Sequence, residues 1–355
     1  MQKETEGIHG GEIWQASQCL EHEHNTNTAI YQLLGDLGFQ STDRPRIWKK
    51  GTQTVINCLV DDIRSCATDY HLDLPYLFDK NTTIITDNYI TCPTQYKVIR
   101  LPISFIGIYH YVPQQQQWDP VRDFAFAVNR IDQRRFLLLL ELGLKVHLHK
   151  GHVNFNCYRP PTVPIFGAHT SPHKETALKY WAEQWEQHTG PEDKASYQRS
   201  YDVLTAQIPV CNYEIEHDEI FTQSYLSIVA ETYSSDNNIS LSEKLFRALV
   251  TPAPWTVSSG RYTVAYLHSM GFDTVSELVD HNHYDRLIEV QDKQRIFVWK
   301  SLEIIKLLKA QDRDALKLRF QQAAQHNQQL LAKMFAQWPA DFEAWTDQLR
   351  RTLLS

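Results

Sequence analysis

The chain has 355 residues and a hydrophobic content of 42%, with 13 glycines and 15 prolines, which excludes fibrous and disordered classes and predicts one large or two ordinary domains. A net charge of −7 argues against binding nucleic acid through bulk charge, although it does not exclude a local basic cleft. Six cysteines without a CxxC pair are typical of reduced thiols, with disulfides or zinc as the alternatives. The polar N-terminus and the absence of a long apolar stretch predict a cytoplasmic protein with no integral membrane segment.

Residues 1–115 have the pattern of a compact α/β domain. A helix is expected over residues 28–37, and Gly38 closes it. Short β-branched strands are expected at residues 53–60, 82–87 and 97–101. Asp61 and Asp62 follow the first of these strands, at the end where open α/β sheets bind their ligands.

A second α/β pattern covers residues 116–310, after a glutamine run. Strands are expected at 124–128, 145–148 and 225–231, and helices at 133–142, 176–188 and 291–308. Residues 311–355 predict two further helices, 316–335 and 342–354, which have no sheet of their own and could pack back on the first domain. The fold class expected is therefore α/β, with two domains that each contain a mostly parallel sheet.

Cationic residues gather where the first strand of the second domain turns into its first helix. This turn contains three arginines, Arg130, Arg134 and Arg135, together with Asn129, and bidentate arginines suit a diphosphate. The alternative is an ordinary solvated helix start with surface cations.

The segment 239–272 contains a second phosphate-type pattern. Ser240 or Ser242 precedes an apolar helical run with Glu243 in its first turn, and Lys244 follows. Prolines end this helix, and a short strand at 255–257 leads through the small residues Ser258 to Gly260 into another helix, 262–270. A strand, a small-residue turn and a helix can hold phosphate on backbone N–H groups.

The same segment resembles a known family. The string SEKLFRAL at 242–249, followed by PWTV at 254–257, resembles an element of the alpha-1,3-fucosyltransferases and of related bacterial and phage glycosyltransferases with the GT-B fold. The resemblance covers residues 224–285 well and 124–142 more loosely. Ser242 stands where threonine is usual, and residues 1–115 contain no matching string.

The resemblance implies two Rossmann-like domains that face each other across a cleft, with a nucleotide diphosphate sugar bound to the second domain. Glu243 would bind the ribose hydroxyls and Lys244 the diphosphate, while one of the arginines at the 129–135 turn would bind the second phosphate face. Glu231 would lie at the donor sugar or ribose.

The transfer expected is inverting and independent of metal, with no cofactor required. Cations and helix N-termini can neutralise a leaving diphosphate. The only DxD spacing, Asp312 to Asp314, is more typical of a solvated helix start. Asp61 or Asp62 is the expected general base on the acceptor side, although both could instead cap a following helix; Asp87 is a second candidate.

The acceptor expected is a glycan. Two alternatives remain: a glycosyltransferase that modifies a hydroxymethylated base in DNA, and a non-catalytic protein that binds a nucleotide sugar or glycan. The histidines carry less information. His147 and His149 are expected on a solvated strand face, with His152 nearby, and His281 and His283 on the surface.

Overall fold

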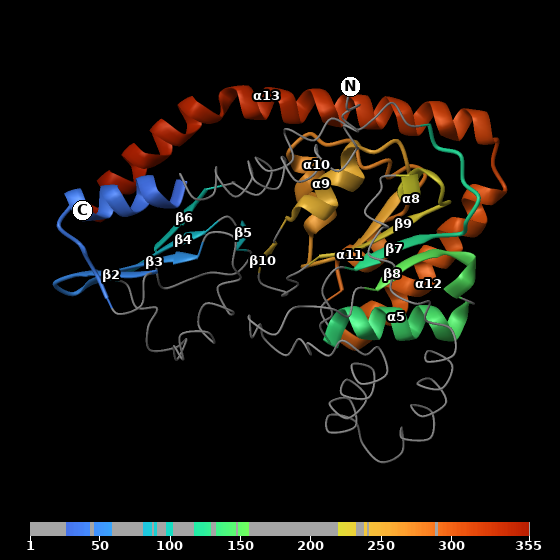
Figure 1. Cartoon of the computed structure of the whole chain (residues 1–355), viewed down its shortest axis with the longest axis horizontal. Helices are drawn as coiled ribbons and strands as arrows, with labels where there is room; N and C mark the ends of the chain where they lie inside the picture. Colours follow the sequence, from blue (N-terminus) through green and yellow to red (C-terminus); the bar gives the residue numbers. More distant parts are fainter. Residues whose placement is uncertain are drawn as a thin grey trace, which may run out of the picture.

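The computed structural model describes residues 26–42, 46–58, 81–86, 89–90, 97–101, 117–128, 133–146, 148–155, 219–231, 238–239, 241–287 and 290–354. Its strands form a five-stranded sheet, a four-stranded sheet and a two-stranded pair (Figure 1). The mixed α/β class predicted from the sequence is confirmed. No helix among these residues is long and apolar enough to cross a membrane.

The first sheet has the strand order β1-β2-β3-β4-β6. Its strands are β1 (Gln40–Ser41), β2 (Ile47–Lys50), β3 (Gln53–Cys58), β4 (Thr82–Thr86) and β6 (Lys97–Arg100). The last three are parallel, and β2 is antiparallel to β3. A helix at residues 26–36 ends at Gly38, whose φ of 81° favours glycine. The three strands and the helix predicted in this region are confirmed where they are described.

The second sheet is parallel throughout, in the order β11-β9-β7-β8. Its strands are β7 (Ala125–Val128), β8 (His152–Phe155), β9 (Ser227–Ala230) and β11 (Trp255–Ser258). The helices α5 (Gln133–Lys145) and α12 (Val290–Lys309) lie on one side of it, and α9 (Glu243–Val250) and α10 (Thr263–Ser269) lie on the other (Figure 1). This layering covers both faces of the sheet, as a parallel sheet requires.

The strand expected at residues 145–148 is wrong. Helix α5 runs on to Lys145, a 3-10 turn covers Leu148–Lys150, and β8 begins only at His152. His149 therefore lies in a helical turn and not on a strand face. Gly151 allows this sharp entry, because a Cβ at that position would overlap the ring of Phe124. His147 lies outside the described residues.

The two separate C-terminal helices expected are also wrong, because a single helix, α13 (Arg313–Leu354), covers both and contains Pro339. Proline removes one helical hydrogen bond and normally ends or kinks a helix. Here both halves keep buried residues at helical spacing, so packing on either side holds the helix together. These residues are Leu316, Phe320, Ala323, Ala324, Asn327 and Leu331 before the proline, and Trp345, Leu349 and Leu353 after it.

Helix α13 extends along both sheets, and its last turns lie beside the helix at residues 26–36 (Figure 1). Leu349 and Leu353 belong to the same apolar cluster as Ile30 and Leu34 of that helix. Lys97 Nζ, at the start of β6, donates a hydrogen bond to the carbonyl of Thr352 at 3.3 Å. The last turns of α13 thus pack against the first sheet and its helix.

The carboxyl ends of the two sheets approach each other. The short strand β10 (Asn238–Ile239), which follows β9, pairs with β5 (Tyr89–Ile90), which follows β4. The guanidinium of Arg100, the last residue of β6, lies 4.9 Å from the ring centre of Tyr266 in α10. One apolar cluster contains residues of both sheets, including Val55 and Val257.

Candidate functional site

Buried charged side chains gather at the carboxyl edge of the second sheet. Arg135, Glu231, Asp285 and Lys293 are 1%, 0%, 5% and 8% exposed. Burying a charge is costly unless partners compensate it. Because this edge is also where open α/β sheets bind ligands, it is the candidate site.

Helix α9 begins at this edge in the way that the sequence predicted. Ser242 is the N-cap, and its hydroxyl accepts a hydrogen bond from the Lys244 N–H at 3.2 Å. The Glu231 carboxylate accepts from the Ser242 N–H at 3.1 Å, and therefore lies at the positive end of the helix dipole. Lys244 is half-buried. Glu243 is the first residue of the helix, and its side chain lies outside the described part of the structure.

Arg135 lies in the first turn of α5, and its Nη2 donates to the carbonyl of Ala230 at 3.1 Å. This bond brings the guanidinium to Ala230 at the end of β9, the residue that precedes Glu231 in the chain. The structure thus gathers Arg135, Glu231 and the start of α9 at one edge. Asn129, Arg130 and the side chain of Arg134 lie outside the described residues.

The turn after β11 contains Ser258 and Gly260, both buried, and leads into α10 as predicted. The first N–H groups of α10 already bind an anion of the protein itself. The Asp285 carboxylate accepts from the Val264 N–H at 3.0 Å and from the Ala265 N–H at 3.1 Å. A carboxylate of the protein thus takes the position at α10 that the sequence pattern predicted for a phosphate.

Burial raises the pKa of Asp285, although the hydrogen bonds from α10 and the positive charge of Lys293 oppose this rise. Lys293 Nζ donates to the carbonyl of Ser259 at 2.9 Å. Two buried charged residues from the segment after α10 therefore hold the turn: Lys293 binds it at Ser259, and Asp285 binds the first turn of α10 that follows it.

Sequence reasoning missed Asp285 and Lys293. Asp285 caps a helix that begins 22 residues earlier in the chain, so no local cap pattern could reveal it. Lys293 lies in the polar first turns of α12, where a lysine normally points to solvent. The neighbouring Gln294 is 2% exposed, and within the described residues its Nε2 has no hydrogen-bond partner.

His281 is buried and not at the surface, so that prediction is wrong. It is 3% exposed, lies 4.8 Å from the Trp255 ring, and pairs through Nε2 with the carbonyl of Thr274 at 3.0 Å. Its Nδ1 pairs with the hydroxyl of Tyr284. Burial lowers the pKa of His281 to about 4, so the ring is neutral near pH 7. His283 is exposed, as expected, and lies 3.0 Å from Asp280.

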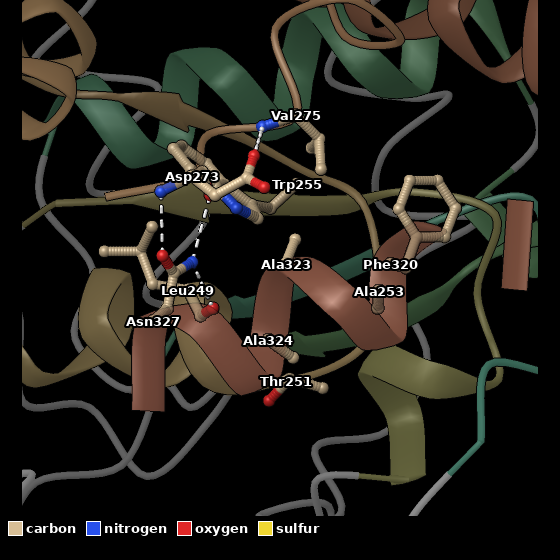
Figure 2. Close-up of a pocket in the computed structure, with 10 residues that line it drawn as sticks. All are labelled: Leu249, Thr251, Ala253, Trp255, Asp273, Val275, Phe320, Ala323, Ala324 and Asn327. Atoms are coloured by element: carbon tan, nitrogen blue, oxygen red, sulfur yellow. Dashed lines mark hydrogen bonds between the residues drawn. The ribbon is translucent and has the colours of Figure 1, made fainter. Parts of the chain in front are cut away.

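A small pocket lies at the other end of β11 (Figure 2). It has room for about one water molecule, and its lining includes Trp255, Phe320 and Asn327. Figure 2 shows the Asn327 amide bonded to Leu249 and Asp273, which ties α13 to the end of α9. None of the predicted site residues lines this pocket.

The acidic residues divide into two groups. Asp312 caps α13, because its carboxylate accepts from the Ala315 N–H at 2.8 Å, and this confirms the helix-start interpretation of the DxD spacing. Asp61, Asp62 and Asp87, the candidate bases, lie outside the described residues. Among the described residues, no group of three or more His, Cys, Asp or Glu side chains is arranged to hold a metal ion.

Comparison with protein-family models, with curated proteins and with solved structures finds no match for this chain.

Proposed function

We propose that the protein is a glycosyltransferase that moves a sugar from a nucleotide diphosphate sugar to a hydroxyl acceptor. The observation that carries this proposal is the start of α9. The Ser242-Glu243-Lys244 element begins at the carboxyl edge of a parallel sheet, beside the buried Glu231 and Arg135. A cation, a helix N-terminus and the sheet edge that binds ligands thus come together where the leaving diphosphate would need them.

In this proposal Lys244 and arginines of α5 and its preceding turn stabilise the leaving diphosphate without a metal ion. Glu243 binds the ribose. The geometry refines the proposed role of Glu231: its carboxylate is bonded to the Ser242 N–H and fully buried, so it would orient α9 and act on the donor through that helix. Asp61 or Asp62 would accept the proton of the acceptor hydroxyl.

The proposed architecture is of the GT-B type, with the acceptor on the first sheet. The closeness of the two carboxyl edges supports it, because a donor on one edge and an acceptor on the other would then be neighbours. A glycan acceptor is favoured over DNA by the net charge of −7.

The test is a thermal-shift panel of nucleoside diphosphates and their sugars, with and without Mg²⁺. A ligand at 100 times its Kd should stabilise the wild type by about 2.7 kcal/mol. Lys244→Ala should abolish most of this stabilisation, whereas Lys306→Ala, which removes an exposed lysine of α12, should leave it unchanged. The donor assignment fails if no nucleotide shifts the wild type, and a shift only with Mg²⁺ would point to a metal-dependent reaction.

A further inference from the structure

Tyr262 stands out at the candidate site because it is an exposed aromatic residue that closely follows three buried residues, 258–260, of the turn. The side chain is 37% exposed, while Ser258 and Ser259 just before it are 3% and 2% exposed. Its backbone φ is 64°, in the left-handed region that residues with a Cβ avoid. Such a conformation persists only where the surrounding structure holds it in place.

The strained backbone is fixed by several bonds. The Tyr262 N–H donates to the carbonyl of Asp285 at 2.7 Å, while the Asp285 carboxylate binds the next turn of the chain at Val264 and Ala265. On the other side, Lys293 Nζ holds the carbonyl of Ser259. Two buried charged residues thus hold the backbone of the segment from which the Tyr262 ring projects.

The surroundings of the ring indicate a ligand chemistry. Tyr262 lies at the carboxyl edge of the sheet, directly after the turn that ends β11. The guanidinium of Arg261 lies over one face of the ring, 4.6 Å from the ring centre, so a positive charge accompanies the aromatic surface and a base would stack on the other face. An aromatic ring beside a cation suits a ligand that has both a planar ring and phosphates.

We propose that Tyr262 stacks on the base of the nucleoside diphosphate part of the donor. This inference rests on the proposed function and extends it: the Ser242–Lys244 element would bind the diphosphate and ribose, and Tyr262 would bind the base. Because every base has a π face, stacking alone adds affinity without selecting the base.

The test compares ring-containing and ring-free probes by isothermal titration calorimetry. The probes are GDP, UDP and ADP, with inorganic pyrophosphate as the ring-free probe. Tyr262→Asn removes the aromatic ring but tolerates a positive φ, so the turn should keep its shape. Tyr262→Gly, in which a positive φ is unstrained, is a second ring-free variant, and Tyr262→Phe is the matched control that keeps the ring.

Both ring-free variants should bind the nucleoside diphosphate that the wild type prefers roughly ten-fold more weakly, while Tyr262→Phe binds it as the wild type does. Pyrophosphate binding should stay the same in all variants. Unchanged nucleotide affinity in both ring-free variants would overturn the inference and leave the proposed function standing. Equal weakening for nucleotide and pyrophosphate would also overturn it, because the turn and not the ring would then matter. A wild type that binds no nucleotide at all would refute the proposed function together with the inference.

Discussion

Asn327 offers the most direct test of how α13 is fastened to the second sheet. It lies in the middle of the long helix, is 1% exposed, and uses its whole amide. Its Oδ1 accepts from the Asp273 N–H at 2.8 Å, and its Nδ2 donates to the carbonyls of Leu249 at 2.8 Å and Asp273 at 3.0 Å. Replacing it by leucine, which is close in size, removes all of these bonds.

The expected cost follows from these contacts. Each lost hydrogen bond contributes about 1 kcal/mol, and backbone groups left buried without a partner add about 1–3 kcal/mol. The neighbouring pocket has room for about one water molecule, which could satisfy part of the loss. Asn327→Leu should therefore lower the free energy of unfolding by about 3–4 kcal/mol, a large share of the stability of an ordinary domain.

The assay is urea unfolding followed by tryptophan fluorescence, with the midpoint compared at constant m-value. Gln328→Leu is the matched control: this next residue along α13 is half-buried, and its Nε2 donates to the carbonyl of Val250 at 2.9 Å. Its loss should cost about 1 kcal/mol. If Asn327→Leu costs no more than Gln328→Leu, then the buried amide does not fasten α13 and our reasoning is wrong.

Two further predictions concern charged groups. The folded state holds His281 neutral with its pKa lowered to about 4, below the ordinary 6.5. Because the unfolded state binds a proton at His281 more readily, the free energy of unfolding should be unaffected by this group above pH 6.5 and should fall by up to about 3 kcal/mol as the pH drops toward 4. The same pH series on His281→Gln should lack this fall. Identical pH dependence in the two proteins would contradict the assignment. Arg319 bonds to Asp273 and Glu277 but is 29% exposed, so Arg319→Met should cost only about 1 kcal/mol. That cost should shrink at 1 M NaCl, and a loss that is independent of salt would show that packing and not charge is responsible.

The sequence could predict features whose causes are local. The start of α9 was predictable because a serine N-cap acts on residues two positions ahead. The parallel strands β7, β9 and β11 were predictable because short apolar runs bounded by turn residues are typical of buried strands.

Features set by distant contacts could not be predicted in this way. The carboxylate that occupies the N-terminus of α10 comes from Asp285, and the tilted ring contact that helps to bury His281 involves Trp255, 26 residues earlier. The continuity of α13 across Pro339 depends on packing against two different sheets. The sequence alone predicts two helices, 316–335 and 342–354, because the contacts that keep α13 continuous come from residues that are distant in the chain.

The path of α13 also has a consequence for how the protein is made. With 42 residues the helix is about 60 Å long, and its final turns complete an apolar cluster that begins with Ile30 and Leu34. During synthesis the ribosome releases these early residues long before Trp345 and Leu349 exist to cover them. Part of the apolar surface of the first sheet therefore stays exposed to chaperones or to aggregation until residues 345–353 have left the ribosome.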